Sequence, residues 1–220
     1  SCIETWQRWL DVQFSYNIRK YLEMGVETVV LAFDNHSYSP AAKAPTQQKR
    51  KSRVITADWH DRMPLPPTIP AEYERLLYNR TFKTRVIEFV IASVTKSLQP
   101  LLKDGQRIII DHRNDPIVLS AGGSSAPMPM CVPLGESDVK FVRYLDMGDM
   151  VIDAVDSDYV IIAMNQVERM QNTQHVCVPN LYVRRLLIDI ETTAEKKRKK
   201  NVTDPAPKPG RQYEHIHINS

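Results

Sequence analysis

The chain has 220 residues, enough for one large domain or for a domain with an insertion. Its 42% hydrophobic residues can form a core, its 25% charged residues are ordinary for a soluble protein, and its net charge of +3 excludes no class of partner. The three cysteines are scattered, which argues against a disulfide framework and a zinc site, and no apolar run approaches the ~20 residues that cross a bilayer. We therefore expect an intracellular protein that does not contact membranes.

The N-terminal half predicts two helices and two strands. Apolar residues at spacings of three and four predict a helix over residues 5–24. The β-branched run Thr28–Phe33 (TVVLAF) predicts a buried parallel strand that ends directly at Asp34. A second apolar pattern predicts a long helix, roughly Ala71–Leu102, and Arg107–Asp111 (RIIID) predicts a second buried strand.

The C-terminal half continues the alternation of strands and helices. We expect a Gly-, Ser- and Pro-rich loop over residues 112–133 and a helix over Glu136–Met147. Strand-like segments follow at Val151–Ala154, Tyr159–Ala163 (a strand or the start of a helix), Val176–Val178, Tyr182–Ile190 and Gln212–Asn219. This rhythm predicts an α/β fold with a mainly parallel sheet flanked by helices.

Two segments are rich in proline and basic residues. Residues 35–70 lack steady periodicity and contain the run Lys49–Arg53 (KRKSR), so we expect a basic arch or lid. Residues 191–220 form a basic, Pro-rich insertion or tail that ends in the last strand-like segment. Its run Lys196–Lys200 (KKRKK) is more typical of a nuclear address or a nonspecific nucleic-acid contact than of a catalytic site, so we favour the nucleus over the cytoplasm.

Acidic residues stand where predicted strands end and where a predicted helix begins: Asp34 after TVVLAF, Glu136 and Asp138 at the helix start, and Asp156 and Asp158 after VIDAV. In open α/β sheets, binding sites form at the carboxyl ends of the parallel strands. Carboxylates that converge there are the hard oxygen ligands that Mg²⁺ or Mn²⁺ prefers. Two such ions activate a water and stabilise the leaving oxygen of a phosphodiester.

These acids also have a plainer interpretation. Taken alone, the D-S-D pair at 156–158 is a solvated turn, and only its combination with the other acids favours a metal site. Asp111 is interpreted as a surface or structural residue, outside the acidic pattern. The remaining acids of the region are predicted to be plain surface charges: Asp146, Asp149 and Asp153.

With Asp34 after a buried strand, G-E-S-D at 135–138 and D-S-D at 156–158, the chain resembles the flap endonuclease/XPG-type 5′-nuclease superfamily. That family has a PIN-like fold, and it places an acidic pair at the start of a helix and a D-x-D pair just under 20 residues later. Here 18 residues separate Asp138 from Asp156. The resemblance implies a PIN-like nuclease domain over residues 1–190 and two Mg²⁺ or Mn²⁺ ions. Its implied metal ligands are Asp34, Glu136, Asp138, Asp156 and Asp158.

The same family carries a Lys and an Arg seven residues apart on a helix at the base of its arch. Lys43 and Arg50 keep that interval, although they lie two residues further from Asp34 than the family pattern. The resemblance implies that this pair steadies the scissile phosphate. The whole basic run is a candidate for gripping nucleic acid, against the alternative of a solvated loop: Lys43, Lys49, Arg50, Lys51 and Arg53.

From this resemblance we predict a metal-dependent 5′-nuclease that hydrolyses phosphodiester bonds in DNA at a 5′ flap or a 5′ end. The stretch GESDVKFVRYLD also resembles the exoribonuclease branch, so a 5′-to-3′ exoribonuclease is an alternative. A third possibility is an inactive PIN-like domain that binds nucleic acid or scaffolds a complex, because the family's first and last acids have no match. Those missing acids imply that further chain segments or protein partners complete the site. The lack of an initiator Met fits a fragment of a longer protein.

Overall fold

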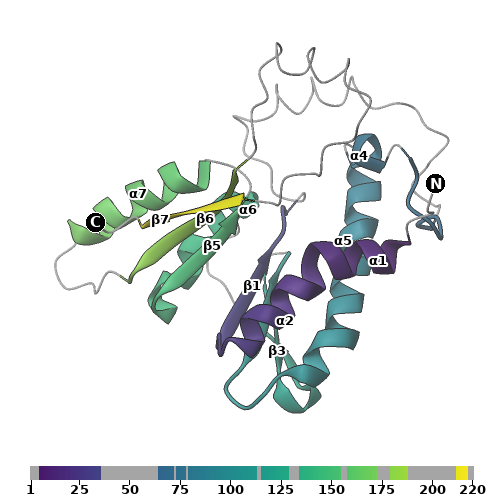
Figure 1. Cartoon of the computed structure of the whole chain (residues 1–220), viewed down its shortest axis with the longest axis horizontal. Coiled ribbons are helices and arrows are strands. Elements are labelled where there is room, and N and C mark those ends of the chain that lie inside the picture. The colour runs from purple at the N-terminus through teal and green to yellow at the C-terminus, as the bar shows by residue number, and fades with distance from the viewer. Residues whose placement is uncertain are drawn as a thin grey trace, which may run out of the picture. The chain divides into compact units, whose positions relative to one another are not determined.

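The computed structural model describes residues 5–35, 64–71, 73–77, 79–112, 115–128, 134–154, 158–172, 179–187 and 212–217. They form an α/β protein, and most of its helices and strands are labelled in Figure 1. The chain divides into two compact units, Ser1–Ser137 and Asp138–Ser220. Within the described residues, no helix has the length and apolar character that crossing a membrane requires.

The first unit opens with one nearly continuous helical segment. It comprises α1 (Trp6–Leu10), the π-helical turn η1 (Asp11–Ser15) and α2 (Tyr16–Glu23). Gly25, at φ +88°, then ends the helix in a conformation that favours glycine. The predicted helix over residues 5–24 is therefore confirmed, with a π-helical turn that the apolar spacing did not indicate. Its buried side chains are Trp6, Leu10, Ile18 and Leu22.

The long helix predicted over Ala71–Leu102 is divided. It consists of α4 (Tyr73–Leu76), α5 (Arg80–Leu98) and the 3₁₀ turn η3 (Gln99–Leu101). The division falls at Asn79, whose side chain accepts hydrogen bonds from two backbone N–H groups of the first turn of α5, at 2.9 and 3.1 Å. An Asn in this position starts a new helix because it satisfies donors that have no partner within the helix.

Four strands form the sheet of the first unit, in the order β1-β2-β3-β4: β1 (Thr28–Ala32), β2 (Arg107–Asp111), β3 (Ile117–Ser120) and β4 (Ser125–Pro127). The two predicted strands, β1 and β2, are confirmed and run parallel. The loop predicted over residues 112–133 was wrong in its described part, because β3 and β4 add to β2 as an antiparallel hairpin. Both strands are too short to show a clear alternating pattern.

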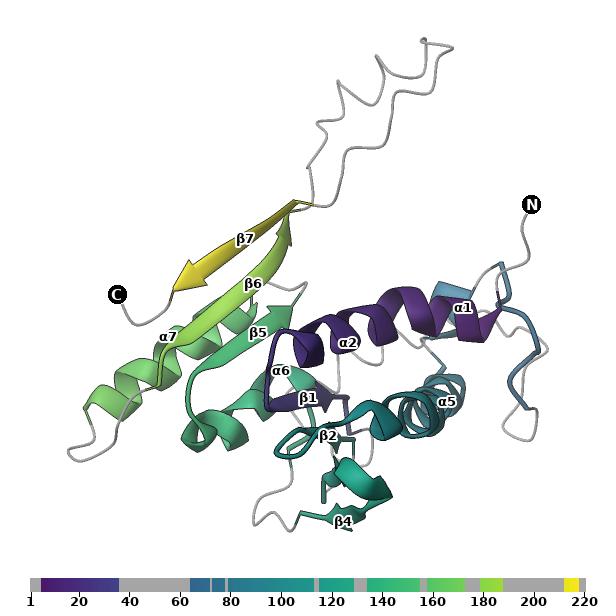
Figure 2. The same ribbon diagram turned by 60° about the horizontal axis from the view of Figure 1, so that its bottom comes forward.

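The core of the first unit lies between its helices and this sheet. In Figure 2 the ribbons of α2 and α5 lie on the same side of β1 and β2. Side chains from these elements form one buried cluster: Leu10, Ile18, Leu22, Val90, Val94, Leu98, Leu102, Ile108, Ile110 and Leu119. The described end of the predicted lid is held near α1, because the Trp6 Nε1–H donates to the Pro66 carbonyl at 2.8 Å and Thr5 bridges to Thr68.

In the second unit, a parallel strand pair is joined through a helix. Its elements are α6 (Ser137–Lys140, which begins at the last residue of the first unit), η5 (Phe141–Met147), β5 (Met150–Ala154), α7 (Asp158–Gln171), β6 (Leu181–Leu187) and β7 (Gln212–His217). The sheet order is β5-β6-β7, with β6 parallel to β5 and antiparallel to β7. Figure 2 shows α7 against this sheet, where Ala163 and Val167 pack with Ile152, Leu181 and Val183.

Several predictions for the second unit are confirmed and one is refined. The strands β5, β6 and β7 coincide with predicted strands to within a few residues at each end. Residues Tyr159–Ala163, for which the sequence allowed a strand or the start of a helix, are helical and belong to α7. The helix predicted over Glu136–Met147 is α-helical only in α6 and continues as a 3₁₀ helix. The prediction of a mainly parallel sheet was wrong, because both described sheets are mixed. Apolar strand patterns report burial, and they do not report the direction of a neighbouring strand.

Asp149, predicted as a surface charge, is exposed and joins the starts of β5 and β6. Its carboxylate accepts hydrogen bonds from the backbone N–H of Asn180 at 2.8 Å and from its side-chain amide at 3.1 Å. The Met150 N–H in turn donates to the Asn180 carbonyl at 2.9 Å. The side-chain and backbone donors of Asn180 lower the pKa of Asp149. This acid therefore has a structural role in setting the register of the second sheet.

Substitution of Ile108 tests the core assignment. Ile108 on β2 is completely buried and Ile117 on β3 is 41% exposed, so Ile108→Ala and Ile117→Ala form a matched pair. We expect Ile108→Ala to lower the free energy of unfolding by roughly 2–5 kcal/mol and Ile117→Ala by less than about 1 kcal/mol. Urea unfolding followed by tryptophan fluorescence measures this, since all three tryptophans of the chain precede residue 138 in the sequence and Trp6 is buried in the first unit. Equal losses would contradict the assignment.

Candidate functional site

Asp34 is held at the carboxyl end of β1 by the backbone on both of its sides. The Phe33 N–H donates to the Asp111 carbonyl at the end of β2, at 2.9 Å. The Asn35 N–H donates to the Gly135 carbonyl, just before α6, at 2.6 Å. Three segments far apart in the sequence therefore meet at Asp34: the ends of two parallel strands and the residues that precede α6.

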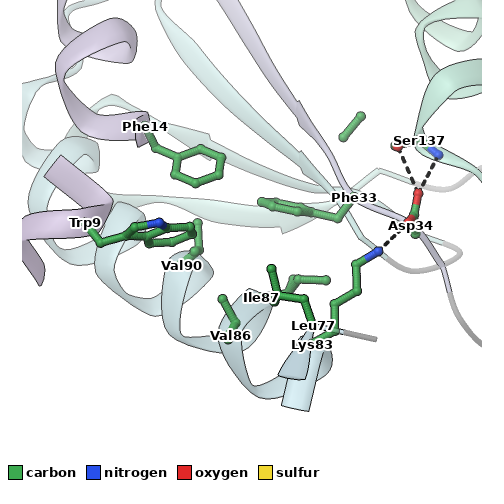
Figure 3. A pocket seen from close by; sticks show the side chains of 11 residues that line it. Trp9, Phe14, Phe33, Asp34, Leu77, Lys83, Val86, Ile87, Val90 and Ser137 are labelled. Carbon is green, nitrogen blue, oxygen red and sulfur yellow. Dashed lines mark hydrogen bonds and ion pairs between the residues drawn. The ribbon is translucent and has the colours of Figure 1, made fainter. Parts of the chain in front are cut away.

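The two oxygens of the Asp34 carboxylate have different partners. Oδ2 accepts a hydrogen bond from the Lys83 ammonium, with 2.6 Å between Nζ and Oδ2. Oδ1 accepts two hydrogen bonds from Ser137, from the backbone N–H at 3.1 Å and from the hydroxyl at 2.9 Å. Figure 3 shows all three interactions around the one carboxylate. Lys83 comes from the first turn of α5, and Ser137 is the first residue of α6.

These partners decide the ionisation of Asp34. Burial alone would raise the pKa of this carboxyl, because desolvation disfavours the charged form. The positive charge and hydrogen bond of Lys83, together with the two donors of Ser137, outweigh burial and lower the pKa from 3.8 to about 2. Asp34 is therefore a carboxylate at neutral pH, with its charge balanced by an ammonium group.

An apolar pocket of about 210 Å³ opens beside this ion pair (Figure 3). Asp34, Lys83 and Ser137 form its polar end. The other walls are aromatic and aliphatic side chains from the N-terminal helical segment, β1 and the helices α4 and α5. These apolar lining residues are Trp9, Phe14, Ala32, Phe33, Leu77, Val86, Ile87 and Val90. The pocket therefore adjoins the Asp34–Lys83 pair on one side.

The structure brings together one part of the predicted acidic set. Asp34 is hydrogen-bonded to Ser137, the central residue of the E-S-D motif, and half-buried Glu136 directly precedes that serine. Asp138 is half-buried in the first turn of α6, and Asp158 is exposed as the first residue of α7, just after β5. The convergence of all the predicted acids stays a prediction. In the described part of the chain, no three or more His, Cys, Asp or Glu side chains are grouped so that they could hold a metal ion.

Several predicted site residues lie outside the described residues. They are Asp156 and the whole basic set: Lys43, Lys49, Arg50, Lys51 and Arg53. Most of the predicted lid over residues 35–70 also lies outside, and only Asn35 is described there along with residues 64–70. The roles of these residues stay predictions.

The chemistry of the described acids fits Mg²⁺ or Mn²⁺. Asp34, Glu136, Asp138 and Asp158 offer only carboxylate oxygens, the donor type that these hard cations prefer. One of these oxygens, Oδ2 of Asp34, already has a cationic partner in the Lys83 ammonium. The Lys83 ammonium thus occupies one oxygen of Asp34, while Ser137 holds the other and fixes the orientation of the carboxylate.

Three residues around this region were missed by sequence reasoning. Ser137 stands inside the G-E-S-D motif, but no role was predicted for it. Lys83 is 49 residues from Asp34, so no local spacing indicates the pair. Lys140 is completely buried in α6, which is unusual for a lysine. The place of Lys83 in the first turn of α5 is visible only in the structure, because the sequence predicts a single helix that begins near residue 71.

Comparison with protein-family models, with curated proteins and with solved structures finds no match to this chain.

The pH dependence of stability tests the surroundings of Asp34. Asp34→Asn removes the charge that Lys83 and Ser137 stabilise, and a pKa lowered from 3.8 to about 2 corresponds to at most about 2 kcal/mol. Because the folded pKa is depressed, this contribution is complete above the unfolded pKa and is lost as the pH falls through about 2. We expect the stability difference between wild type and Asp34→Asn to be largest at neutral pH and to shrink below about pH 4. Urea unfolding at several pH values measures it, and a difference that grows in acid would contradict this account.

Proposed function

We propose that the chain is a PIN-like, metal-dependent 5′-nuclease domain that hydrolyses phosphodiester bonds in nucleic acid. The observation that supports this most is the bond between Asp34, at the end of β1, and Ser137 of the G-E-S-D motif at the start of α6. These two segments are 103 residues apart, and both are parts of the acidic pattern in the sequence. A carboxylate at the end of a parallel strand, beside a helix start with Glu136 just before it and Asp138 in its first turn, is a suitable place for divalent cations.

In this proposal the acids of the chain hold two Mg²⁺ or Mn²⁺ ions: Asp34, Glu136, Asp138, Asp156 and Asp158. When bound, the ions make water a stronger nucleophile at neutral pH and neutralise charge on the phosphodiester. Ser137 orients Asp34 by holding one carboxylate oxygen. Lys43 and Arg50 contact the scissile phosphate and stabilise its charge as it develops. The basic run Lys49–Arg53 contacts neighbouring phosphates.

DNA with a 5′ flap or a 5′ end is the proposed substrate, in the nucleus. The KKRKK run at Lys196–Lys200 supports both parts of this proposal, because such runs serve as nuclear addresses and as contacts to nucleic acid. Further chain segments or protein partners supply the acids that the family pattern has and this chain lacks.

A second candidate function is a catalytically inactive domain that binds nucleic acid or scaffolds a complex. The specific observation in its favour is the ion pair of Asp34, since the Lys83 ammonium already balances the charge that a metal ion would balance. An inactive domain keeps such a pair permanently, whereas a nuclease must open it for the metal ion.

Cleavage assays with paired variants test the nuclease proposal. Asp158→Ala removes a proposed metal ligand at the start of α7, and Asp146→Ala removes an exposed acid that has no proposed role. We expect Asp158→Ala to lower Mg²⁺-dependent cleavage of 5′-flap DNA at least about 100-fold, and Asp146→Ala to leave it within about twofold. Full activity of Asp158→Ala would contradict the proposed metal site.

The choice of substrate separates the two nuclease branches and the inactive domain. We expect faster cleavage of 5′-flap DNA than of single-stranded RNA with a 5′ monophosphate, measured with the same protein and the same Mg²⁺ concentration. A clear preference for the RNA would instead favour a 5′-to-3′ exoribonuclease. Binding of both nucleic acids without cleavage of either would favour the scaffold.

A further inference from the structure

A π-helical turn builds one wall of the pocket beside Asp34. Trp9 and Phe14 both line this pocket, although they are five residues apart in one helical segment. In an α-helix, side chains five residues apart point about 140° away from each other. The π-helical turn η1, closed by the Tyr16 N–H on the Asp11 carbonyl, brings such residues onto the same face of the helix. The two rings therefore meet, with their centroids 5.6 Å apart.

Phe33 extends this aromatic wall to the polar end of the pocket. Its ring centroid lies 6.4 Å from that of Phe14, and Phe33 directly precedes Asp34 in the chain. Figure 3 shows the rings of Trp9, Phe14 and Phe33 along the pocket, and all three side chains are half-buried. Because π-helical turns occur frequently at functional sites, an aromatic wall that depends on such a turn favours a pocket that binds a ligand.

The pocket has the size of one aromatic ligand. Its volume is about 210 Å³, and all of its lining residues belong to the first unit. An apolar cavity of about 150 Å³ is sufficient to bind benzene. A pocket with aromatic and aliphatic walls and a somewhat larger volume therefore suits one planar ring system, such as a pyrimidine or a purine.

The polar end of the pocket has no net charge, but it keeps hydrogen-bond donors and an acceptor. The Lys83 ammonium has three N–H donors, and within the described residues one of them bonds to Asp34. The Asp34 carboxylate has about four lone-pair sites, of which Lys83 and Ser137 use three. Because the charges of the pair balance, an ion gains little there. A neutral group with a donor beside an acceptor bonds to both partners.

We propose that this pocket binds one unpaired nucleobase of a nucleic-acid strand, with its ring against the aromatic wall and its edge hydrogen-bonded to the Asp34–Lys83 pair. A nucleobase is planar, aromatic and uncharged, and it carries donors and acceptors side by side on its edge. Proteins that bind single strands contact bases through aromatic side chains in this way. This binding mode rests on the proposed function, in the nucleic-acid binding that the nuclease and the scaffold share. It uses the ion pair as it stands and needs no metal ion.

Binding of two DNA strands by the full chain tests this proposal. One strand is an oligothymidylate of about ten nucleotides, and the other has the same backbone with an abasic unit at every position. Both strands carry the same charge, so the ratio of their affinities reports the contribution of the bases. We expect wild type to bind the strand with bases at least about tenfold more tightly than the abasic strand. Fluorescence anisotropy measures this, with EDTA present so that neither strand is cleaved.

A matched pair of variants ties this ratio to the pocket. Phe14→Leu removes a ring from the aromatic wall and keeps an apolar side chain, whereas Tyr16→Leu removes an exposed ring from the same helical segment. We expect Phe14→Leu to lower the affinity for the strand with bases about tenfold and to leave the affinity for the abasic strand within about twofold. The salt dependence of Phe14→Leu should match that of wild type, because no phosphate contact is lost. Tyr16→Leu should match wild type with both strands.

A filled pocket gives a second test that does not depend on Phe14. Ala32 lines the pocket from β1, so Ala32→Leu places a larger side chain in it and leaves the aromatic wall in place. We expect this variant to lose most of the preference for the strand with bases. Tryptophan fluorescence during urea unfolding checks that each variant is folded.

The outcomes separate the base pocket from the function on which it rests. Equal affinity of wild type for the two strands would overturn the base pocket and leave binding of the phosphate backbone standing. A preference for bases that persists in both Phe14→Leu and Ala32→Leu would place the bases elsewhere on the protein and would also overturn it. If wild type binds neither strand, nucleic-acid binding itself fails, and the proposed function falls together with the base pocket.

Discussion

The charge of Asp34 constrains how the end of β1, the first turn of α5 and the start of α6 meet. A partly buried carboxylate is stable only when donors or cations satisfy both of its oxygens. Here the donors come from α5 and from the start of α6, while the backbone on each side of Asp34 bonds to the end of β2 and to Gly135. Satisfying one side chain therefore fixes the approach of several elements that are distant in the sequence.

The same interaction connects stability with the proposed chemistry. Because Lys83 balances the charge of Asp34, the first unit buries this acid without needing a metal ion. The nuclease proposal requires divalent cations near this carboxylate, whereas the scaffold proposal requires none. The two donors of Ser137 serve either function, since they orient the carboxylate whichever cation it holds.

Prediction from the sequence succeeded where burial and local pattern coincide. The apolar runs of β1 and β2 are long enough to be recognised as strands, and the acids at Asp34 and Asp158 do follow strands. Prediction from the sequence failed for β3 and β4, which are short strands within the predicted loop. Their pairing defines them, since β3 pairs with β2 and β4 pairs with β3. Prediction also missed the helix start at Asn79, because the apolar spacing continues across that residue.

The sequence by itself determined the α/β class, most of the helices and strands, and the positions of the acids at the ends of strands and the starts of helices. These features depend on neighbours a few residues away, whose periodicity and end signals can be read along the chain. Only the tertiary structure decided the strand directions, the division into two units and the pairing of Asp34 with Lys83 and Ser137. Those features depend on contacts between residues as much as 103 positions apart, which no local pattern encodes.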